Sequence, residues 1–348
     1  MTYPREGVRD EAGVVRSLHW GECLDPGDPL SQARAVETGY SVAICTYRRP
    51  DSLLRLLRSV ALQQPQPAQL VIVDASPDDA TERVVAGWVT EHATPRCVLY
   101  YRVADQLRGL TRQRNFALAR VSTDLVAFFD DDIVLRDGCL DQMQQVHRRR
   151  PDVVGVGALI ANHSDHPDLV WRLRRLLFMV PNLSPGRYYA SGVSTPWWPA
   201  RMATAPEVEG DWLPGGATMW RTVAARETGF VEGFDGYGSG EDLEFSLRVS
   251  RQGKLVMAAA AQVEHLHERG GRPDEEELGY ATLRNHHSIH SASWGRFRWA
   301  QMWFAYATLA ESLLQSVHLV RPHLSRGTWR YLRGTLRYVQ DWRRSAAR

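Results

Sequence analysis

Three consecutive aspartates, Asp130, Asp131 and Asp132, directly follow an apolar segment at residues 125–129. Like charges this close repel one another, so each raises the cost of ionising its neighbours. A divalent cation removes that conflict, and hard carboxylate oxygens suit Mg²⁺ or Mn²⁺. A solvated turn that caps a helix is the alternative. The position at the carboxyl end of a buried strand favours a metal site.

A second acidic pair, Glu241 and Asp242, follows the glycine-rich run at residues 236–240. The glycines permit a tight loop, and the acids begin a helix predicted at residues 242–252. Plain helix capping is the alternative, because acids at a helix N-terminus favour the dipole. The nearby Gly215-Gly216 and the upstream aspartates favour a functional loop.

Two histidines, His265 and His267, follow a strand predicted at residues 255–263. Residues two apart in an extended chain point to the same side, which is a workable geometry for a metal ligand pair. An incidental pair of surface histidines is the alternative.

The elements that position these residues alternate regularly from residue 40 to residue 160. Apolar strands are predicted at 41–46, 70–74, 98–102, 125–129 and 153–160, with helices beginning at Pro50 and lying over 79–89, 111–120 and 138–149. This alternation predicts an α/β fold with a doubly wound, mostly parallel sheet. Ligands bind beyond the carboxyl ends of such strands, where Thr46, Asp74 and Asp130 lie.

Several of these segments resemble family 2 glycosyltransferases of the GT-A fold. Residues 42–50 (VAICTYRRP) resemble the first strand and nucleotide loop, and residues 71–76 (VIVDAS) resemble the second strand motif, with Ala75 in place of its second acid. The resemblance continues in order through Arg114-Asn115, the Asp-x-Asp motif at 130–132, the glycine segment at 213–217 (LPGGA) and the acidic pair Glu241-Asp242.

The resemblance implies that the donor is a nucleotide diphosphate sugar, with a UDP-sugar as the first choice, and it implies which residues bind it. Asp74 would read the base with help from Thr46 and Arg48. Asp130 or Asp131 would hold the ribose, and Arg114 would add a fixed positive charge near the phosphates. The donor-binding residues also include Gly215 and Gly216.

The resemblance also implies metal-dependent, inverting transfer to an acceptor hydroxyl. Asp132 would bind Mg²⁺ or Mn²⁺, together with Asp130 and with His265, or in its place His267. Asp242 would be the catalytic base, and Glu241 would orient the acceptor. The acceptor is a carbohydrate, a lipid-linked molecule or another small molecule.

Domain organisation is expected to follow this resemblance. Residues 1–38 form an N-terminal extension. Residues 39–270 form the GT-A catalytic domain, with a nucleotide-binding half at 39–160 and an acceptor half at 161–270. Residues 271–348 form a helical region, with helices predicted at 276–292, 298–319 and 326–344. In the acceptor half, Tyr188, Tyr189, Trp197 and Trp198 either stack on a sugar or anchor an irregular loop.

Charge is distributed unevenly along the 348 residues. Residues 296–348 carry a net charge of +8, although the whole chain carries only +2. A basic stripe (Arg326, Arg330, Arg333, Arg337) and an apolar stripe (Trp329, Leu332, Leu336, Val339) predict an amphipathic C-terminal helix. This helix docks either on the catalytic domain or as a peripheral contact on a membrane. The acidic remainder of the chain argues against a nucleic-acid partner, and nothing in the sequence predicts the oligomeric state.

Cysteine spacing and hydropathy predict a reduced, cytoplasmic chain. The four cysteines, Cys23, Cys45, Cys97 and Cys139, form no CxxC pair. No signal peptide and no spanning helix are expected, because no run of 18 apolar residues occurs.

Two other functions fit the acidic motifs less well. A nucleotidyltransferase acting on sugar phosphates usually carries a glycine-rich loop after its first strand, whereas this chain has residues 46–50 (TYRRP) there. A non-catalytic nucleotide-sugar-binding protein would not need Asp130, Asp132, Asp242 and His265 together.

Overall fold

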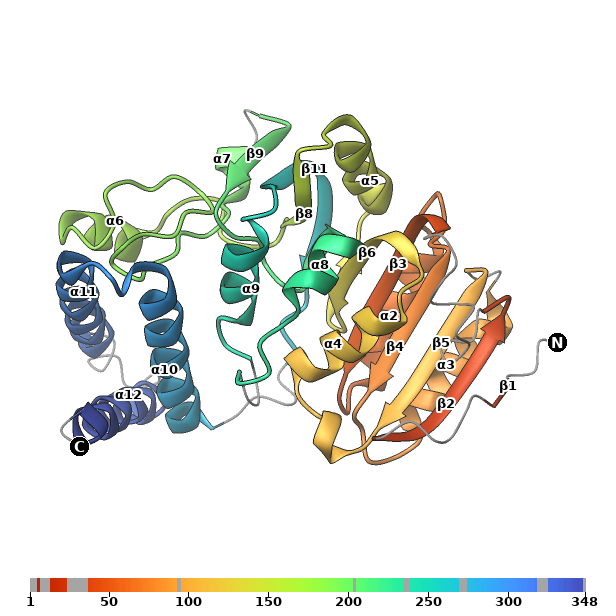
Figure 1. Cartoon of the computed structure of the whole chain (residues 1–348), viewed down its shortest axis with the longest axis horizontal. Coiled ribbons are helices and arrows are strands. Elements are labelled where there is room, and N and C mark those ends of the chain that lie inside the picture. The colour runs from red at the N-terminus through yellow and green to blue at the C-terminus, as the bar shows by residue number, and fades with distance from the viewer. Residues whose placement is uncertain are drawn as a thin grey trace.

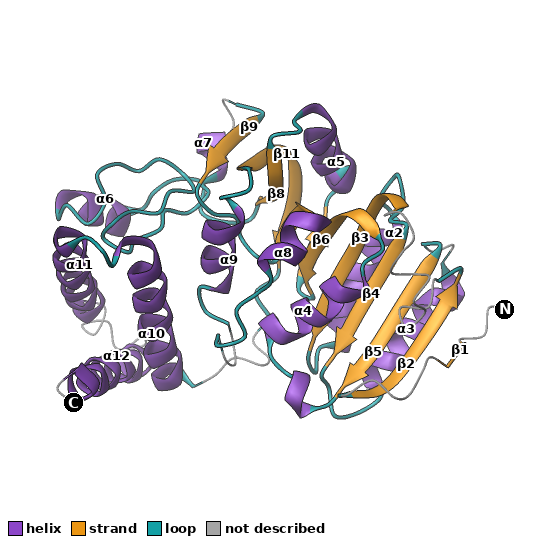
Figure 2. Ribbon diagram, in the orientation of Figure 1, coloured by secondary structure: helices purple, strands orange, loops and turns teal. Residues whose placement is uncertain are grey.

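One mixed sheet forms the centre of the fold in the computed structural model, which describes residues 5–6, 13–23, 37–92, 95–202, 205–234, 238–268, 274–317 and 325–346. Over these residues the sheet has eleven strands in the order β1-β2-β5-β4-β3-β6-β10-β8-β11-β7, with β9 paired to β11 (Figures 1 and 2). The strands are β1 Arg5–Glu6, β2 Val14–Gly21, β3 Glu37–Thr46, β4 Gln69–Asp74, β5 Cys97–Val103, β6 Thr123–Asp130, β7 Ile133–Leu135, β8 Val153–Ile160, β9 Glu207–Gly210, β10 Ala217–Arg221 and β11 Lys254–His265.

Helices cover both faces of the sheet, as its apolar strands require. The helices are α2 Pro50–Ala61, α3 Ala80–Glu91, α4 Leu110–Arg120, α5 Cys139–Arg149, α6 Leu169–Leu176, α7 Pro199–Met202, α8 Thr222–Thr228, α9 Glu241–Val249, α10 Glu275–Trp294, α11 Arg298–Val317 and α12 Ser325–Ala346, with a short 3₁₀ turn at Asp105–Leu107. One core cluster includes side chains of α2, α3 and α5, and a second cluster on the other face includes side chains of α4, α8 and α9.

The parallel strands β5, β4, β3 and β6 confirm the predicted α/β fold. Thr46 pairs with Asp74, and Cys45 pairs with Asp130, so these strands end at one edge. Helix α2 begins at Pro50, whose fixed φ suits the first helical position. Its leucines are buried at helical spacing, and each contributes about 1.5–3 kcal/mol of hydrophobic stabilisation.

The antiparallel strands β10 and β2 were among those not predicted. Strand β10 lies between β6 and β8 and pairs antiparallel with both. Strand β2, within the expected N-terminal extension, pairs antiparallel with β5 and so belongs to the sheet. Because β10 runs antiparallel to β6, its first residues follow Gly215-Gly216 directly beside Asp130, the last residue of β6.

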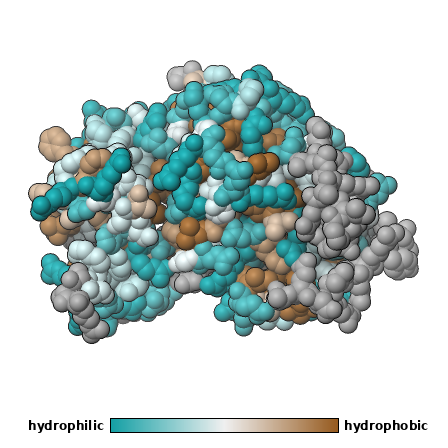
Figure 3. Space-filling view, viewed as in Figure 1, coloured by the Kyte–Doolittle hydropathy of each residue, from teal (hydrophilic) through white to brown (hydrophobic). Residues whose placement is uncertain are grey.

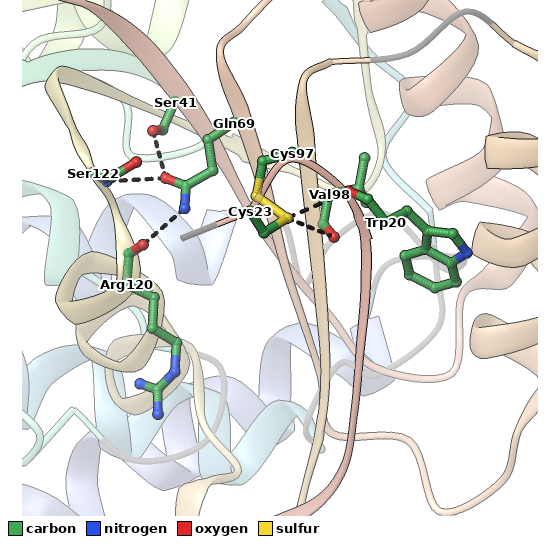
Figure 4. The surroundings of a disulfide bond; sticks show 8 residues. All are labelled: Trp20, Cys23, Ser41, Gln69, Cys97, Val98, Arg120 and Ser122. Carbon is green, nitrogen blue, oxygen red and sulfur yellow. Dashed lines mark hydrogen bonds between the residues drawn. A yellow bond between two sulfur atoms is a disulfide. The ribbon is translucent and has the colours of Figure 1, made fainter. Parts of the chain in front are cut away.

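A disulfide joins Cys23 to Cys97 (Figure 4). The expectation that all four cysteines are reduced is therefore wrong, and so is the argument from cysteine spacing for a reducing compartment. The two residues are 74 apart in sequence and meet only because β2 pairs with β5, where Gly21 lies opposite Cys97. Cys45 and Cys139 are free thiols.

The C-terminal helices form a separate layer beyond the sheet, at the left of Figure 1. Helices α10 and α12 approach closely at two glycines. A Cβ on Gly334 would lie 1.9 Å from the carbonyl oxygen of Glu276, and a Cβ on Gly279 would lie 2.1 Å from that of Tyr331. None of the described helices is long and apolar enough to cross a membrane.

The basic stripe of α12 faces α10. Arg330 pairs with Asp274, Arg333 with Glu276, and Arg337 with Glu276 and Glu277. The predicted apolar stripe is divided, because Leu332 is buried whereas Trp329 and Leu336 are exposed. Arg330, Arg333 and Arg337 therefore join α12 to the first turn of α10.

The disulfide should contribute measurably to stability. A link that closes a loop of this length stabilises the native state by about 4 kcal/mol in the chain-entropy account. We expect Cys23→Ser to lower the free energy of unfolding by about 2–4 kcal/mol, and reductant to have the same effect on the unsubstituted protein but not on the variant. Thiol titration of the denatured, unreduced chain should give two free thiols, whereas four would contradict the link.

Candidate active site

Asp130 ends β6 beside the glycine pair. Its backbone N–H donates to the carbonyl oxygen of Gly216 at 3.1 Å. A Cβ on Gly216 would lie 2.3 Å from Oδ2 of Asp130, so only glycine permits this approach. The side chain of Asp130 is about one-third exposed, whereas Asp131 and Asp132 are buried.

Asp131 is held from the first strand and the loop after it. The Thr46 hydroxyl donates to Oδ2 of Asp131 at 2.7 Å, and the Arg49 guanidinium donates to Oδ1 at 3.0 Å. The same guanidinium lies 3.6 Å from Oδ2 of Asp132. Burial raises the pKa of Asp131 to about 6, although Arg49 opposes this. Arg49 is therefore the first countercharge of the aspartate triplet.

Arg48, the arginine that the resemblance selects, points elsewhere. Its backbone has a positive φ of 55°, its N–H donates to the Ser76 hydroxyl, and its guanidinium stacks 5.2 Å from the centre of the Tyr47 ring. The turn at Arg48 directs Arg49 toward the acids. Sequence reasoning missed Arg49 because two adjacent arginines in a loop cannot be told apart without that turn.

Asp132 contacts the end of β11. Nε2 of His265 lies 3.1 Å from Oδ1 of Asp132, and the Glu268 N–H donates to Oδ2 at 3.1 Å. Burial acts to raise the pKa of Asp132, but the hydrogen bond and charge of His265, with Arg49, lower it overall. The structure thus brings together the predicted metal ligands Asp132 and His265.

His163 joins the two predicted histidines. One nitrogen of each of His163, His265 and His267 lies within 4.8 Å of the others. Asn162 donates to the carbonyl oxygen of His265 and accepts from its N–H, at 2.8 and 2.9 Å, which fixes the end of β8 against the end of β11. Burial, and then the two other histidines, lower the pKa of His163, which favours the neutral imidazole that binds metals. The parallel pairing of β8 with β11 was not predicted, so His163 had no sequence signal.

Arg114 links the two acidic motifs. Its buried guanidinium lies 2.9 Å from Oδ1 of Asp130 and 2.7 Å from Oε1 of Glu241. Burial acts to lower the pKa of Arg114, but the two carboxylates raise it overall. A Cβ on Gly215 would lie 2.9 Å from both the guanidinium and Oε1 of Glu241. The fixed positive charge expected at Arg114 is present and is paired within the protein.

The acidic pair begins α9 directly after Gly240, which has a positive φ of 85°. The backbone N–H groups of Leu243 and Gly215 donate to the carboxylate of Asp242 at 2.8 and 3.4 Å. Burial raises the pKa of Asp242, and it raises the pKa of Glu241 to about 8 against the opposing charge of Arg114. Gly236 and Tyr237 of the predicted loop lie outside the described residues.

Asp74 lies at the same sheet edge but is fully buried. The Tyr100 hydroxyl donates to its Oδ2, and the Ser76 N–H donates to its Oδ1, both at 2.8 Å. Because Asp74 has no exposed surface, a nucleotide base does not reach it in this conformation. The geometry favours a role for Asp74 in holding the loop that contacts Arg48.

The aromatic segment before β9 is mostly packed inside the protein. Tyr188, Trp197 and Trp198 are buried, which fits anchoring of the loop better than stacking on a sugar. A cavity of about 280 Å³ lies between this segment and the C-terminal helices. One of its lining residues, His286, would lie 3.8 Å from a Cβ on Gly240, the residue before the acidic pair.

Comparison with known proteins bears on the family and the fold. Residues 41–209 match the model of Glycosyl transferase family 2. A mannosyltransferase from Pyrobaculum calidifontis, solved with GDP-Man and Mn²⁺, superposes with a TM-score of 0.52 at 14% identity, over 90% of this chain and 92% of that one. GalNAc-T7, solved with UDP, GalNAc and Mn²⁺, gives 0.56 at 15% identity, over 84% of this chain and 54% of that one. No curated protein sequence gives a significant match.

The fold is that of the GT-A glycosyltransferases. The match over residues 41–209 supports the resemblance to glycosyltransferase family 2 that the motifs suggested.

Removing Arg114 should destabilise the protein. Arg114→Met leaves Asp130 and Glu241 without their shared countercharge, and breaking a buried ion pair in this way costs about 3–5 kcal/mol. The double variant Arg114→Met/Glu241→Gln should recover part of the loss, because the buried acid is then neutral. Denaturant unfolding measures both.

Arg112→Met on the same helix is the matched control, since Arg112 is more exposed. It should change the free energy of unfolding by less than about 0.5 kcal/mol. Equal stability of Arg114→Met and the unsubstituted protein would contradict the assigned linkage.

Proposed function

We propose that this protein transfers a sugar, with inversion, from a nucleoside diphosphate sugar to an acceptor hydroxyl. The observation that supports this best is the Arg114 linkage, which joins the aspartate triplet to the acidic pair through ion pairs of 2.9 and 2.7 Å. A donor held at the triplet would thereby lie beside the base. The family match and the nucleotide-bound relatives support the donor class.

Asp132 and His265 would hold the divalent metal, with His163 and His267 close enough to contribute. A carboxylate oxygen and an imidazole nitrogen 3.1 Å apart are a suitable donor set. The carboxylate of Asp132 suits Mg²⁺ or Mn²⁺, and the two nucleotide-bound structures that resemble this fold were solved with Mn²⁺. When bound, the metal would neutralise charge on the diphosphate leaving group.

Arg49 and Asp131 would bind the donor on its nucleotide side. Arg49 already lies between two carboxylates, and a diphosphate would offer its guanidinium equivalent oxygens. Asp131, fixed by Thr46, is the better placed acceptor for a ribose hydroxyl. Asp130 is committed to Arg114, which would position it beside the phosphates.

Asp242 would take the proton of the attacking acceptor hydroxyl. Its half-buried carboxylate is fixed by two backbone N–H groups, and its raised pKa suits a general base. Glu241, tied to Arg114, would hold the geometry and orient the acceptor. We assign the acceptor side to the cavity of about 280 Å³ next to Gly240. Opposite-side attack needs no covalent intermediate and inverts the anomeric centre.

Loss of the metal-binding carboxylate should remove donor binding. Asp132→Asn cannot offer the charged oxygen that a divalent ion requires. We expect no Mn²⁺-dependent binding of UDP or GDP by titration calorimetry, while circular dichroism shows that the variant is folded. Asp137→Asn, an exposed acid nearby, is the control and should bind normally. Unchanged affinity in Asp132→Asn would contradict the proposed site.

Loss of the base should separate binding from transfer. Asp242→Asn should keep donor affinity but reduce turnover by about 10²-fold or more, since general-base help is worth about 10²–10⁴-fold. Glu244→Gln, two residues further along α9, should keep most activity. A parallel fall of affinity and turnover in Asp242→Asn would make this residue a binding group instead.

A further inference from the structure

The surface of α11 that faces away from the protein is apolar. Five side chains, Trp299, Met302, Tyr306, Leu309 and Leu313, recur every three or four residues and so share one side of the helix. Their exposed fractions lie between 44% and 73%. The opposite side carries Ala307 and Ala310, which pack on Met179. An exposed group of apolar side chains of this kind marks a surface that contacts a partner or a membrane.

The end of α6 extends this apolar side. The indole N–H of Trp303 donates to the carbonyl oxygen of Phe178, and the Tyr306 hydroxyl donates to that of Leu177, at 2.8 and 2.7 Å. Phe178 itself is 79% exposed, and Leu169 and Leu176 of α6 are similarly exposed. Part of this surface is visible at the left edge of Figure 3. We name it the α6–α11 surface, formed by Leu169, Leu176, Phe178, Trp299, Met302, Tyr306, Leu309 and Leu313.

Arginines border the α6–α11 surface. Arg172, Arg175, Arg296 and Arg298 are exposed on α6 and at the start of α11, and among the described residues none of them lies in an ion pair. The arginine stripe of α12 differs, because it is paired with the acids of α10. The one acid of α11, Glu311, pairs with Arg174 at 2.7 Å. The border therefore carries uncompensated positive charge beside apolar side chains.

We propose that the α6–α11 surface docks on a lipid bilayer that contains anionic lipid. Apolar side chains with tryptophan and tyrosine suit the boundary between headgroups and acyl chains, and arginines suit the lipid phosphates. The helix would lie on the membrane, since no described helix can span it. A two-fold symmetric dimer formed through this surface would bring the arginines of the two copies together, and these like charges would repel one another. The contact lies on α6 and α11, whereas the sequence analysis left a membrane contact of α12 as one of two alternatives.

Vesicle co-sedimentation tests this docking without any glycosyl transfer. Phosphatidylcholine vesicles with 30 mol% phosphatidylglycerol should bind the protein, and pure phosphatidylcholine should bind it at least about tenfold more weakly. Met302→Glu/Leu309→Glu should abolish binding. The matched control, Leu62→Glu/Val223→Glu, changes two equally exposed apolar residues elsewhere and should bind normally.

Charge-reversal variants show whether the arginines beside α11 or those of α12 bind the anionic vesicles. Arg296→Glu/Arg298→Glu should weaken binding to the anionic vesicles at least about tenfold, whereas Arg343→Glu/Arg344→Glu on α12 should not. Thermal unfolding confirms that each variant is folded. The proposal would be overturned by equal binding to neutral and anionic vesicles, or by loss of binding only in the α12 variant. It would also be overturned if the protein bound no vesicles and instead formed a dimer that Met302→Glu/Leu309→Glu converts to monomer.

Discussion

The buried guanidinium of Arg114 is the interaction on which the candidate site depends. Two carboxylates from distant parts of the chain, Asp130 and Glu241, come together only because one positive charge lies between them. Buried charges of one sign are costly unless they are paired. Arg49 does the same for Asp131 and Asp132. The site is therefore an arrangement of acids in which two arginines supply fixed countercharges.

The sheet edge explains why these charges meet. Parallel strands end at the same edge of a sheet, so Thr46 at the end of β3 and the aspartates at the end of β6 lie side by side there. The antiparallel β10 then returns beside β6 and sets Gly215-Gly216 against Asp130, where any side chain would collide. The helix that begins at Glu241 completes the site. The C-terminal helices support this loop, since Asn285 of α10 donates to the carbonyl oxygen of Ser239 at 2.8 Å.

Local patterns in the sequence predicted those features of the fold and the site that depend on residues close together in the chain. Apolar segments alternating with amphipathic helices identified the parallel strands, and clustered acids after a strand identified the triplet. Contacts across the sheet were missed, because no local pattern encodes which strands pair. Three features follow from strand pairing: the Cys23–Cys97 disulfide, the position of His163 beside His265, and the place of β10 between β6 and β8. Arg49 was missed for a different reason, since its direction depends on the positive φ of Arg48.

A screen of donor hydrolysis tests the central claim most directly. The protein is incubated with UDP-, GDP- and dTDP-sugars, with Mn²⁺ and with a chelator, and the released products are separated. A site built from Asp132, His265 and Arg114 predicts slow release of a nucleoside diphosphate from one class of donor, present with Mn²⁺ and absent with the chelator. Release of a nucleoside monophosphate, or hydrolysis that the chelator leaves unchanged, would contradict a metal-dependent glycosyl transfer site.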